Sequence, residues 1–201
     1  MPRMTSVELH EILEKGTQKL GMTAEDGAKT AIATLSQGLP HYTHQLALQA
    51  VRAALNERRL SIAKRDVRPA IQAAVDNTQQ SQQEGYRRAI ASPQKDNLYG
   101  RVLLACARAR TDSFGYFAAA DVRSPMSMIM KKRYDIPSFA KHLNDFCDPV
   151  RGSVLRKEGV KRRYRYRFRN PLMPPFIVMK GIMDGLILSE VALSPNDSES
   201  M

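Results

Sequence analysis

Residues 163–169, with the sequence RYRYRFR, decide how the second half of the chain folds. Basic and aromatic side chains alternate strictly, which is the period-2 pattern of a β-strand with one buried face. The three aromatic rings are expected to pack on a core, and the four guanidinium groups to face solvent or phosphates. The stretch therefore predicts a half-buried and strongly basic strand.

A partner for this strand lies just before it in the chain. Residues 153–156 (SVLR) predict a short strand, and Glu158-Gly159 predicts a turn, so the two strands would form a hairpin. Further upstream, residues 98–108 form a strongly apolar helical pattern, and residues 114–117 (FGYF) predict a turn and a short extended segment.

Two more helices are expected between the first helix and the hairpin. Residues 118–130 can form one helix, which Pro125 is expected to kink or end because proline lacks the backbone N–H. The second spans Pro137 to Asp148, with Phe139, Leu143 and Phe146 on one face. Helix, helix, helix and hairpin is the order of a winged helix-turn-helix. We assign it to residues 97–185.

The first 80 residues predict a small helical bundle. Thr5 to Glu8 (TSVE) has the capping-box spacing that begins a helix, which continues to about Gly21. A second helix is expected from Ala24 to Gln37, followed by Gly38 as a left-handed C-cap, and Pro40 opens a third helix. Ser61-Ile62 and Asp66-Val67 predict a short turn into a fourth helix.

The predicted fold class is thus mainly α: a helical bundle followed by a winged helix-turn-helix with a small β-hairpin. The bundle occupies residues 1–80, a polar and glutamine-rich connector follows at 81–96, and the composition of 186–201 predicts a disordered tail. The composition of the connector is compatible with a solvated helix or with an inter-domain linker.

Charge points to a polyanionic partner and to the second half of the chain. The formal net charge is +11, and hydrophobic residues make up 43%, which excludes wholesale disorder. Residues 1–80 carry a net charge of +2, and residues 81–201 carry +9. Nucleic acid is the first expected partner and an anionic membrane surface the second.

The candidate nucleic-acid-binding residues lie in the hairpin and in the helix before it. Residues 151–169 hold nine basic residues and one acid, Glu158. The candidates are Arg156, Lys157, Lys161, Arg162, Arg163, Arg165, Arg167 and Arg169 of the hairpin, with Lys141 and His142 of the helix. Arginine suits this role because its planar fork binds phosphate oxygens bidentately. A solvated edge strand and an acidic protein partner remain as alternatives.

The helix before the hairpin would be the recognition helix, and it presents Ser138, Lys141, His142 and Asn144 outward. This helix carries no net positive charge to attract DNA, because Asp145 and Asp148 offset Lys141. Both aspartates are expected to be solvated. We therefore expect contact with phosphates rather than reading of base edges.

Catalysis, metal binding and membrane insertion have no clear sequence signal. Residues 27–30 (GAKT) lack the glycines that a phosphate-binding loop requires, and His41 with His44 lacks further ligands. Cys106 and Cys147 form no CxxC pair and are expected to be buried reduced thiols. The apolar stretch 174–179 is too short to span a membrane, and no secretory signal is visible, so we expect a cytoplasmic protein.

Two stretches carry a family resemblance. Gly38-Leu39-Pro40 resembles the Gly-x-Pro step of the lid of AAA+ and STAND ATPases, including the Gly-Leu-Pro motif of NB-ARC proteins. Residues 97–107 (NLYGRVLLACA) with 115–117 (GYF) look like the opening of the winged helix that follows the lid in origin-recognition-type ATPases. The resemblance covers about residues 1–180.

The resemblance implies a Walker nucleotide core N-terminal to the lid, and this sequence contains no such core. It implies that Pro40 lies against the nucleotide base and that His41 stands where an arginine often senses the γ-phosphate. ATP or ADP would then bind only when the core is supplied, and this chain alone would not be an enzyme.

Three functions remain open. The first is the lid and winged helix of an AAA+-like ATP-binding protein that contacts duplex DNA through its basic wing. The second is a protein-interaction module of a signalling or defence ATPase, binding an ATPase core or a second copy of itself. The third is a free-standing winged-helix transcription regulator.

Overall fold

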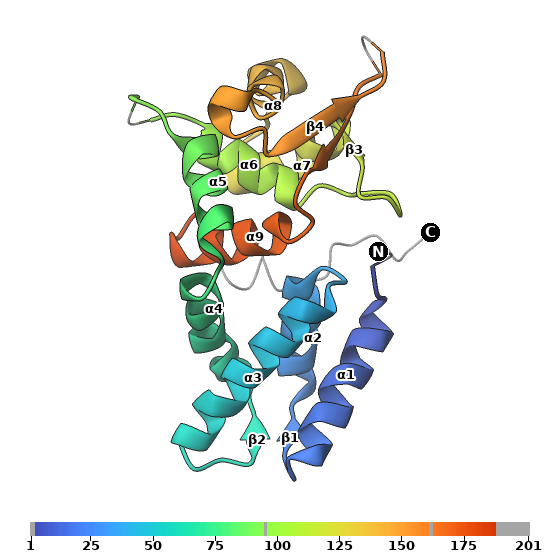
Figure 1. Cartoon of the computed structure of the whole chain (residues 1–201), viewed down its shortest axis with the longest axis vertical. Coiled ribbons are helices and arrows are strands. Elements are labelled where there is room, and N and C mark those ends of the chain that lie inside the picture. The colour runs from blue at the N-terminus through green and yellow to red at the C-terminus, as the bar shows by residue number, and fades with distance from the viewer. Residues whose placement is uncertain (1–2, 95, 161–162, 188–201) are drawn as a thin grey trace. The chain divides into compact units, whose positions relative to one another are not determined.

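The computed structural model describes residues 3–94, 96–160 and 163–187 and is mainly helical (Figure 1). It divides into two compact units. Of the described residues, the first unit contains 3–77 together with 179–187, and the second is Thr78–Val178. Of the predicted tail 186–201, only Leu186 and Ile187 lie within the described residues.

The first unit is a bundle of four helices with two very short strands at one end (Figure 1). Its elements are α1 (Ser6–Lys19), β1 (Thr23–Ala24), α2 (Asp26–Ser36), α3 (Pro40–Asn56), β2 (Ser61–Ile62), a 3₁₀ turn at Lys64–Asp66, and α4 (Val67–Asp76).

The α3 helix is the centre of this bundle and contacts α1, α2 and α4. Its inner face carries Leu46, Ala50 and Ala54, which are fully buried. Small side chains on this face let neighbouring helix backbones approach closely. The predicted capping box of α1 is also present, since the Thr5 N–H donates to Glu8 Oε2 at 2.7 Å and the Glu8 N–H to Thr5 Oγ1 at 3.3 Å.

The two strands correct the predicted start of the second helix. Ala24 belongs to β1 and not to a helix, and α2 begins at Asp26. β1 pairs in parallel with β2, with Thr23 opposite Ser61. The parallel pair joins segments that are far apart in the sequence, and two-residue strands leave no periodic pattern by which to detect them.

The second unit combines helices with a three-stranded sheet. Its elements are α5 (Gln80–Ile90), α6 (Tyr99–Ala107), β3 (Phe117–Ala118), α7 (Ala119–Met130), a 3₁₀ turn at Ile136–Ser138, α8 (Ala140–Asp145), a 3₁₀ turn at Pro149–Arg151, β4 (Leu155–Glu158), β5 (Arg165–Phe168) and the beginning of α9 (Met173–Met183). The sheet is antiparallel, in the order β3-β5-β4.

The predicted alternation of the basic strand is present in β5. Tyr166 and Phe168 are buried, and their rings lie 6.0 Å and 6.3 Å from the ring of Phe117 on β3. Arg165 and Arg167 point to the opposite face, because successive strand residues alternate. The aromatic face therefore forms part of the core of this unit.

The helix predicted over residues 118–130 is present as α7, and Pro125 does not end it; the fully buried Val122 and Met126 lie on either side of the proline. Two further predicted boundaries are wrong. The helix expected from Pro137 to Asp148 is only α8 with a 3₁₀ turn before it, since Phe139 has φ −129°. Ser153 is not in a strand, because its φ is +45°.

The segment expected to connect two domains contains a packed helix. In α5 the side chains of Gln82, Tyr86 and Ala89 are buried. The ring of Tyr86 meets that of Phe176 edge to face at 5.6 Å, and Gln82 Nε2 donates to the Leu172 carbonyl at 2.8 Å. The sequence did not predict these contacts, because the segment is rich in glutamine and glutamine is usually solvated.

Candidate nucleic-acid interface

The hairpin and the helix before it share one surface. Lys157 of β4 donates from Nζ to Asn144 Oδ1 on α8 at 2.9 Å, and the same Nζ lies 4.4 Å from the centre of the Tyr164 ring. Lys141, also on α8, is exposed. We call Lys141, Asn144, Lys157 and Tyr164 the helix-side surface. It presents two ammonium groups, an amide and an aromatic ring.

His142 does not point outward, contrary to the sequence prediction. It is half-buried, and its ring meets that of Tyr99 at 4.7 Å in an edge-to-face arrangement. Burial lowers the pKa of His142, so this imidazole is biased toward its neutral form. Ser138 and Asn144 are exposed as expected.

The two acidic residues beside α8 have structural partners. Tyr99 donates its hydroxyl to Asp145 Oδ2 at 2.7 Å, and Asp145 is half-buried. Asp148 accepts the Val150 N–H at 2.8 Å and so caps the following 3₁₀ turn. The prediction that Asp145 is solvated is wrong, because its carboxylate is directed toward Tyr99.

A second basic surface lies on the other face of the sheet. We call Tyr116, Arg156, Glu158, Arg165 and Arg167 the outer sheet face. Arg156 stands directly opposite Arg167, and Glu158 stands opposite Arg165. The three guanidinium carbons lie 4.8–5.7 Å from the centre of the Tyr116 ring, and its hydroxyl accepts a hydrogen bond from Arg156.

Carboxylates compensate part of the charge on the outer sheet face. Arg156 pairs with Glu158 at 2.6 Å, and Arg165 pairs with Asp112 at 2.9 Å. Among the described residues, no carboxylate forms an ion pair with Arg167. The sequence prediction of a purely cationic strand face is thus only partly correct, since it missed Asp112, which is distant in the sequence.

The remaining basic candidates differ in their environment. Arg163 and Arg169 are exposed. Lys161 and Arg162 lie outside the described residues. Arg151 serves the fold, because its guanidinium lies 3.4 Å from the centre of the Tyr99 ring and donates to the carbonyls of Ala89 and Ala91 at 3.0 and 2.7 Å.

Pro40 and His41, the residues assigned to nucleotide by resemblance, lie at the beginning of α3 in the first unit. Pro40 occupies the first turn and is half-buried, and His41 is exposed. The preceding Gly38 has φ +77°, and a Cβ there would lie 2.7 Å from Arg3 Cβ and 2.9 Å from the Met4 carbonyl oxygen. Only glycine fits this turn without displacement of residues 3 and 4.

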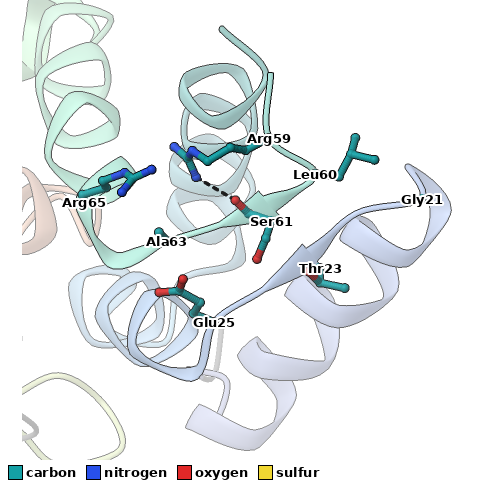
Figure 2. A pocket seen from close by; sticks show the side chains of 8 residues that line it. All are labelled: Gly21, Thr23, Glu25, Arg59, Leu60, Ser61, Ala63 and Arg65. Atoms are coloured by element: carbon teal, nitrogen blue, oxygen red, sulfur yellow. Dashed lines mark hydrogen bonds between the residues drawn. The ribbon is translucent and has the colours of Figure 1, made fainter. Parts of the chain in front are cut away.

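A pocket of about 440 Å³ lies in the first unit, beside β1 and β2 and beyond the C-terminal end of α3 (Figure 2). This pocket was not predicted from the sequence. Its lining is Gly21, Thr23, Glu25, Arg59, Leu60, Ser61, Ala63 and Arg65. Pro40 and His41 are not part of it.

One of the two arginines that line this pocket, Arg59, makes several contacts within the protein. Arg59 forms a fork with the buried Asp66, with distances of 2.6 Å from Nη2 and 3.0 Å from Nη1, and Nη1 also donates to the Ser61 carbonyl at 2.8 Å. Its Nε donates to Glu57 at 3.0 Å. These bonds use the guanidinium donors, so Arg59 stabilises the loop after α3 and does not offer a charge to a ligand.

Metal-binding clusters and membrane-spanning helices are both absent from the described residues. No group of three or more His, Cys, Asp or Glu side chains is placed to hold a metal ion there. None of the described helices combines the length and apolar composition needed to cross a bilayer. Cys106 is buried and Cys147 half-buried, and both are free thiols.

Comparisons with protein-family models, with curated proteins and with solved structures found no match to this chain.

Proposed function

We propose that the second unit binds duplex DNA through the helix-side surface and the β4–β5 hairpin. The observation that carries this proposal is the contact of Lys157 with Asn144 at 2.9 Å, which joins the hairpin and α8 into one polar, cationic surface. Lys141, Lys157 and Arg163 are exposed around it. Ammonium and guanidinium groups in this number favour a phosphate backbone, because each neutralised phosphate releases counterions.

The order of elements supports the same interpretation. α6, β3, α7, α8 and the β4–β5 hairpin follow one another in the order of a winged helix, and β3 pairs with β5 and not with β4. In winged helices the helix before the hairpin approaches the major groove. α8 has only six residues, so we assign phosphate contact to this surface and no reading of base sequence.

The salt dependence of binding tests the proposal. A fluorescently labelled mixed-sequence duplex is titrated with the protein at several salt concentrations, and the logarithm of the affinity is plotted against that of the salt concentration. Replacing Lys141, Lys157 and Arg163 together with Ala should reduce the slope of this plot by about 2–3, because each residue contacts about one phosphate.

A matched control removes the same charge from the first unit. Lys19, Arg52 and Arg68 are exposed there, and their joint replacement with Ala should leave the slope unchanged. An equal decrease of the slope in both triple variants would show that the protein attracts DNA only through its overall charge. That result would contradict the assigned surface. Absence of duplex binding at low salt, combined with self-association, would favour a protein-interaction module instead.

We also propose that the first unit acts as the lid of an AAA+-like ATPase, responding to ATP or ADP bound to a core that this sequence does not contain. The support is local: the Gly38 turn leaves Pro40 in the first turn of α3 and His41 exposed. The chain alone should therefore not hydrolyse ATP. Phosphate release above that of a heat-inactivated sample of the purified chain would contradict this.

A further inference from the structure

An exposed phenylalanine stands at the tip of the turn that leads into β3. The side chain of Phe114 is 74% exposed. Its neighbours Arg110, Thr111 and Ser113 are also exposed and polar or charged. The ring is therefore an exposed apolar group whose exposed neighbours in the sequence are polar or charged.

The turn holds the backbone that carries this ring in a fixed conformation. Asp112 Oδ1 accepts the backbone N–H groups of Phe114 at 3.0 Å and Tyr116 at 2.8 Å. The Asp112 N–H bonds to the Tyr116 carbonyl at 2.9 Å, and Gly115 takes φ +80° to close the turn. Asp112 also pairs with Arg165, which ties the turn to β5. A side chain with two torsions on a fixed backbone loses little entropy when it binds a ligand.

A guanidinium group lies beside the ring. Arg167 donates from Nη1 to the Phe114 carbonyl at 3.3 Å, and its guanidinium lies 4.8 Å from the centre of the Tyr116 ring. It stands directly opposite Arg156 in the sheet, and like charges in this position repel one another. Arg156 has Glu158 as a partner, whereas Arg167 forms no ion pair among the described residues, so an anion is the group that completes this site.

We propose that the outer sheet face, with Phe114 at its edge, binds single-stranded nucleic acid, with a base stacked on Phe114 and a neighbouring phosphate on Arg167. Aromatic rings beside arginines, here Phe114 and Tyr116 with Arg167, are the chemistry of single-strand binding, because every base has a face to stack and every nucleotide carries a phosphate. This inference extends the proposed function to a second site, on the face of the sheet opposite to the buried Tyr166 and Phe168.

The site is tested with a fluorescently labelled oligothymidine strand. Phe114→Ser and Arg167→Gln should each weaken its binding at least about fivefold, the lower bound for loss of one stacked base or one strong phosphate contact. Phe114→Tyr should retain binding, because the ring persists. Val150→Ser is the matched control, since Val150 is 82% exposed on another element and its loss should have no effect.

Competition separates this inference from the proposed function. Excess unlabelled duplex should leave the labelled strand bound, and the triple variant Lys141, Lys157 and Arg163 to Ala should lose duplex binding while retaining the strand. The inference is overturned if the duplex displaces the labelled strand. It is also overturned if Phe114→Ser and Arg167→Gln bind the strand with wild-type affinity, and that result would favour an acidic protein partner for this face. Strand binding that depends on Phe114, in a protein that binds no duplex, would support the inference and contradict the proposed function.

Discussion

At the scale of single residues, the charged side chains of this chain divide into two groups by the number of bonds they already make. Arg59 and Arg151 direct their guanidinium groups to carboxylates, carbonyls or a ring of the protein itself. Lys141, Arg163 and Arg169 are exposed. A count of basic residues in the sequence treats both groups alike, although only the second is available to a polyanion.

Asp66 provides the first prediction. Burial acts to raise the pKa of Asp66, but the hydrogen bonds from Arg59 and from the Ala63 N–H hold it below its usual value. Asp66→Asn should lower the free energy of unfolding by about 3 kcal/mol at neutral pH, because it breaks the fork to the buried carboxylate and leaves Arg59 with only the more exposed Glu57 as an ionic partner. Chemical denaturation measures this.

The same carboxylate predicts a pH dependence. A lowered folded-state pKa gives stability that is present above about pH 4 and is lost as the pH falls through the folded-state value. The difference between wild type and Asp66→Asn should therefore shrink in acid. A constant difference from neutral to acidic pH would show that the Asp66 charge does not contribute.

At the scale of elements, the aromatic and basic alternation of β5 was predictable because its period matches the two faces of a strand. The lengths of α8 and β4 were not, since they depend on the backbone of Phe139 and Ser153, whose φ values are −129° and +45°. The helix-side surface followed in part from sequence, through Lys141 and Lys157. Phe114, Tyr116 and Asp112 were missed as site residues, although Asp112 to Gly115 has the residues of a turn.

Arg151 links three elements and gives the next prediction. It stacks on Tyr99 at the start of α6, bonds to the carbonyls at the end of α5, and belongs to the 3₁₀ turn before β4. Arg151→Lys should lower the free energy of unfolding by about 1–2 kcal/mol, because an ammonium group cannot stack and form both hydrogen bonds in the same geometry.

The control for Arg151 is functional. Since the positive charge is kept and the residue contacts its own unit, the slope of duplex affinity against salt should not change in Arg151→Lys. A reduced slope with unchanged stability would instead place Arg151 at the nucleic-acid interface.

At the scale of the whole molecule, function and charge are distributed unequally between the two units. The proposed duplex and single-strand surfaces belong to Thr78–Val178, and the Gly38 turn, the pocket and the Arg59 fork belong to the other unit. Effects of substitutions in different units are expected to add, because each unit has its own core.

Gly38 tests this separation. Gly38→Ala should destabilise the first unit by about 2 kcal/mol, because it combines a left-handed φ with a Cβ 2.7 Å from Arg3 Cβ. Gly21→Ala should cost about half as much, since Gly21 has φ +64° but no atom within 4 Å of an added Cβ. At temperatures where both variants are folded, duplex affinity should equal that of the wild type.

The facing arginines 156 and 167 have an evolutionary consequence. Replacing Arg167 with Glu would turn a repulsive cross-strand neighbour into an attractive one and strengthen the sheet by a few tenths of a kcal/mol, while removing the cation proposed to meet the strand. Selection for stability alone would favour that exchange, so both arginines are expected to persist among homologues only where the proposed strand binding is also under selection.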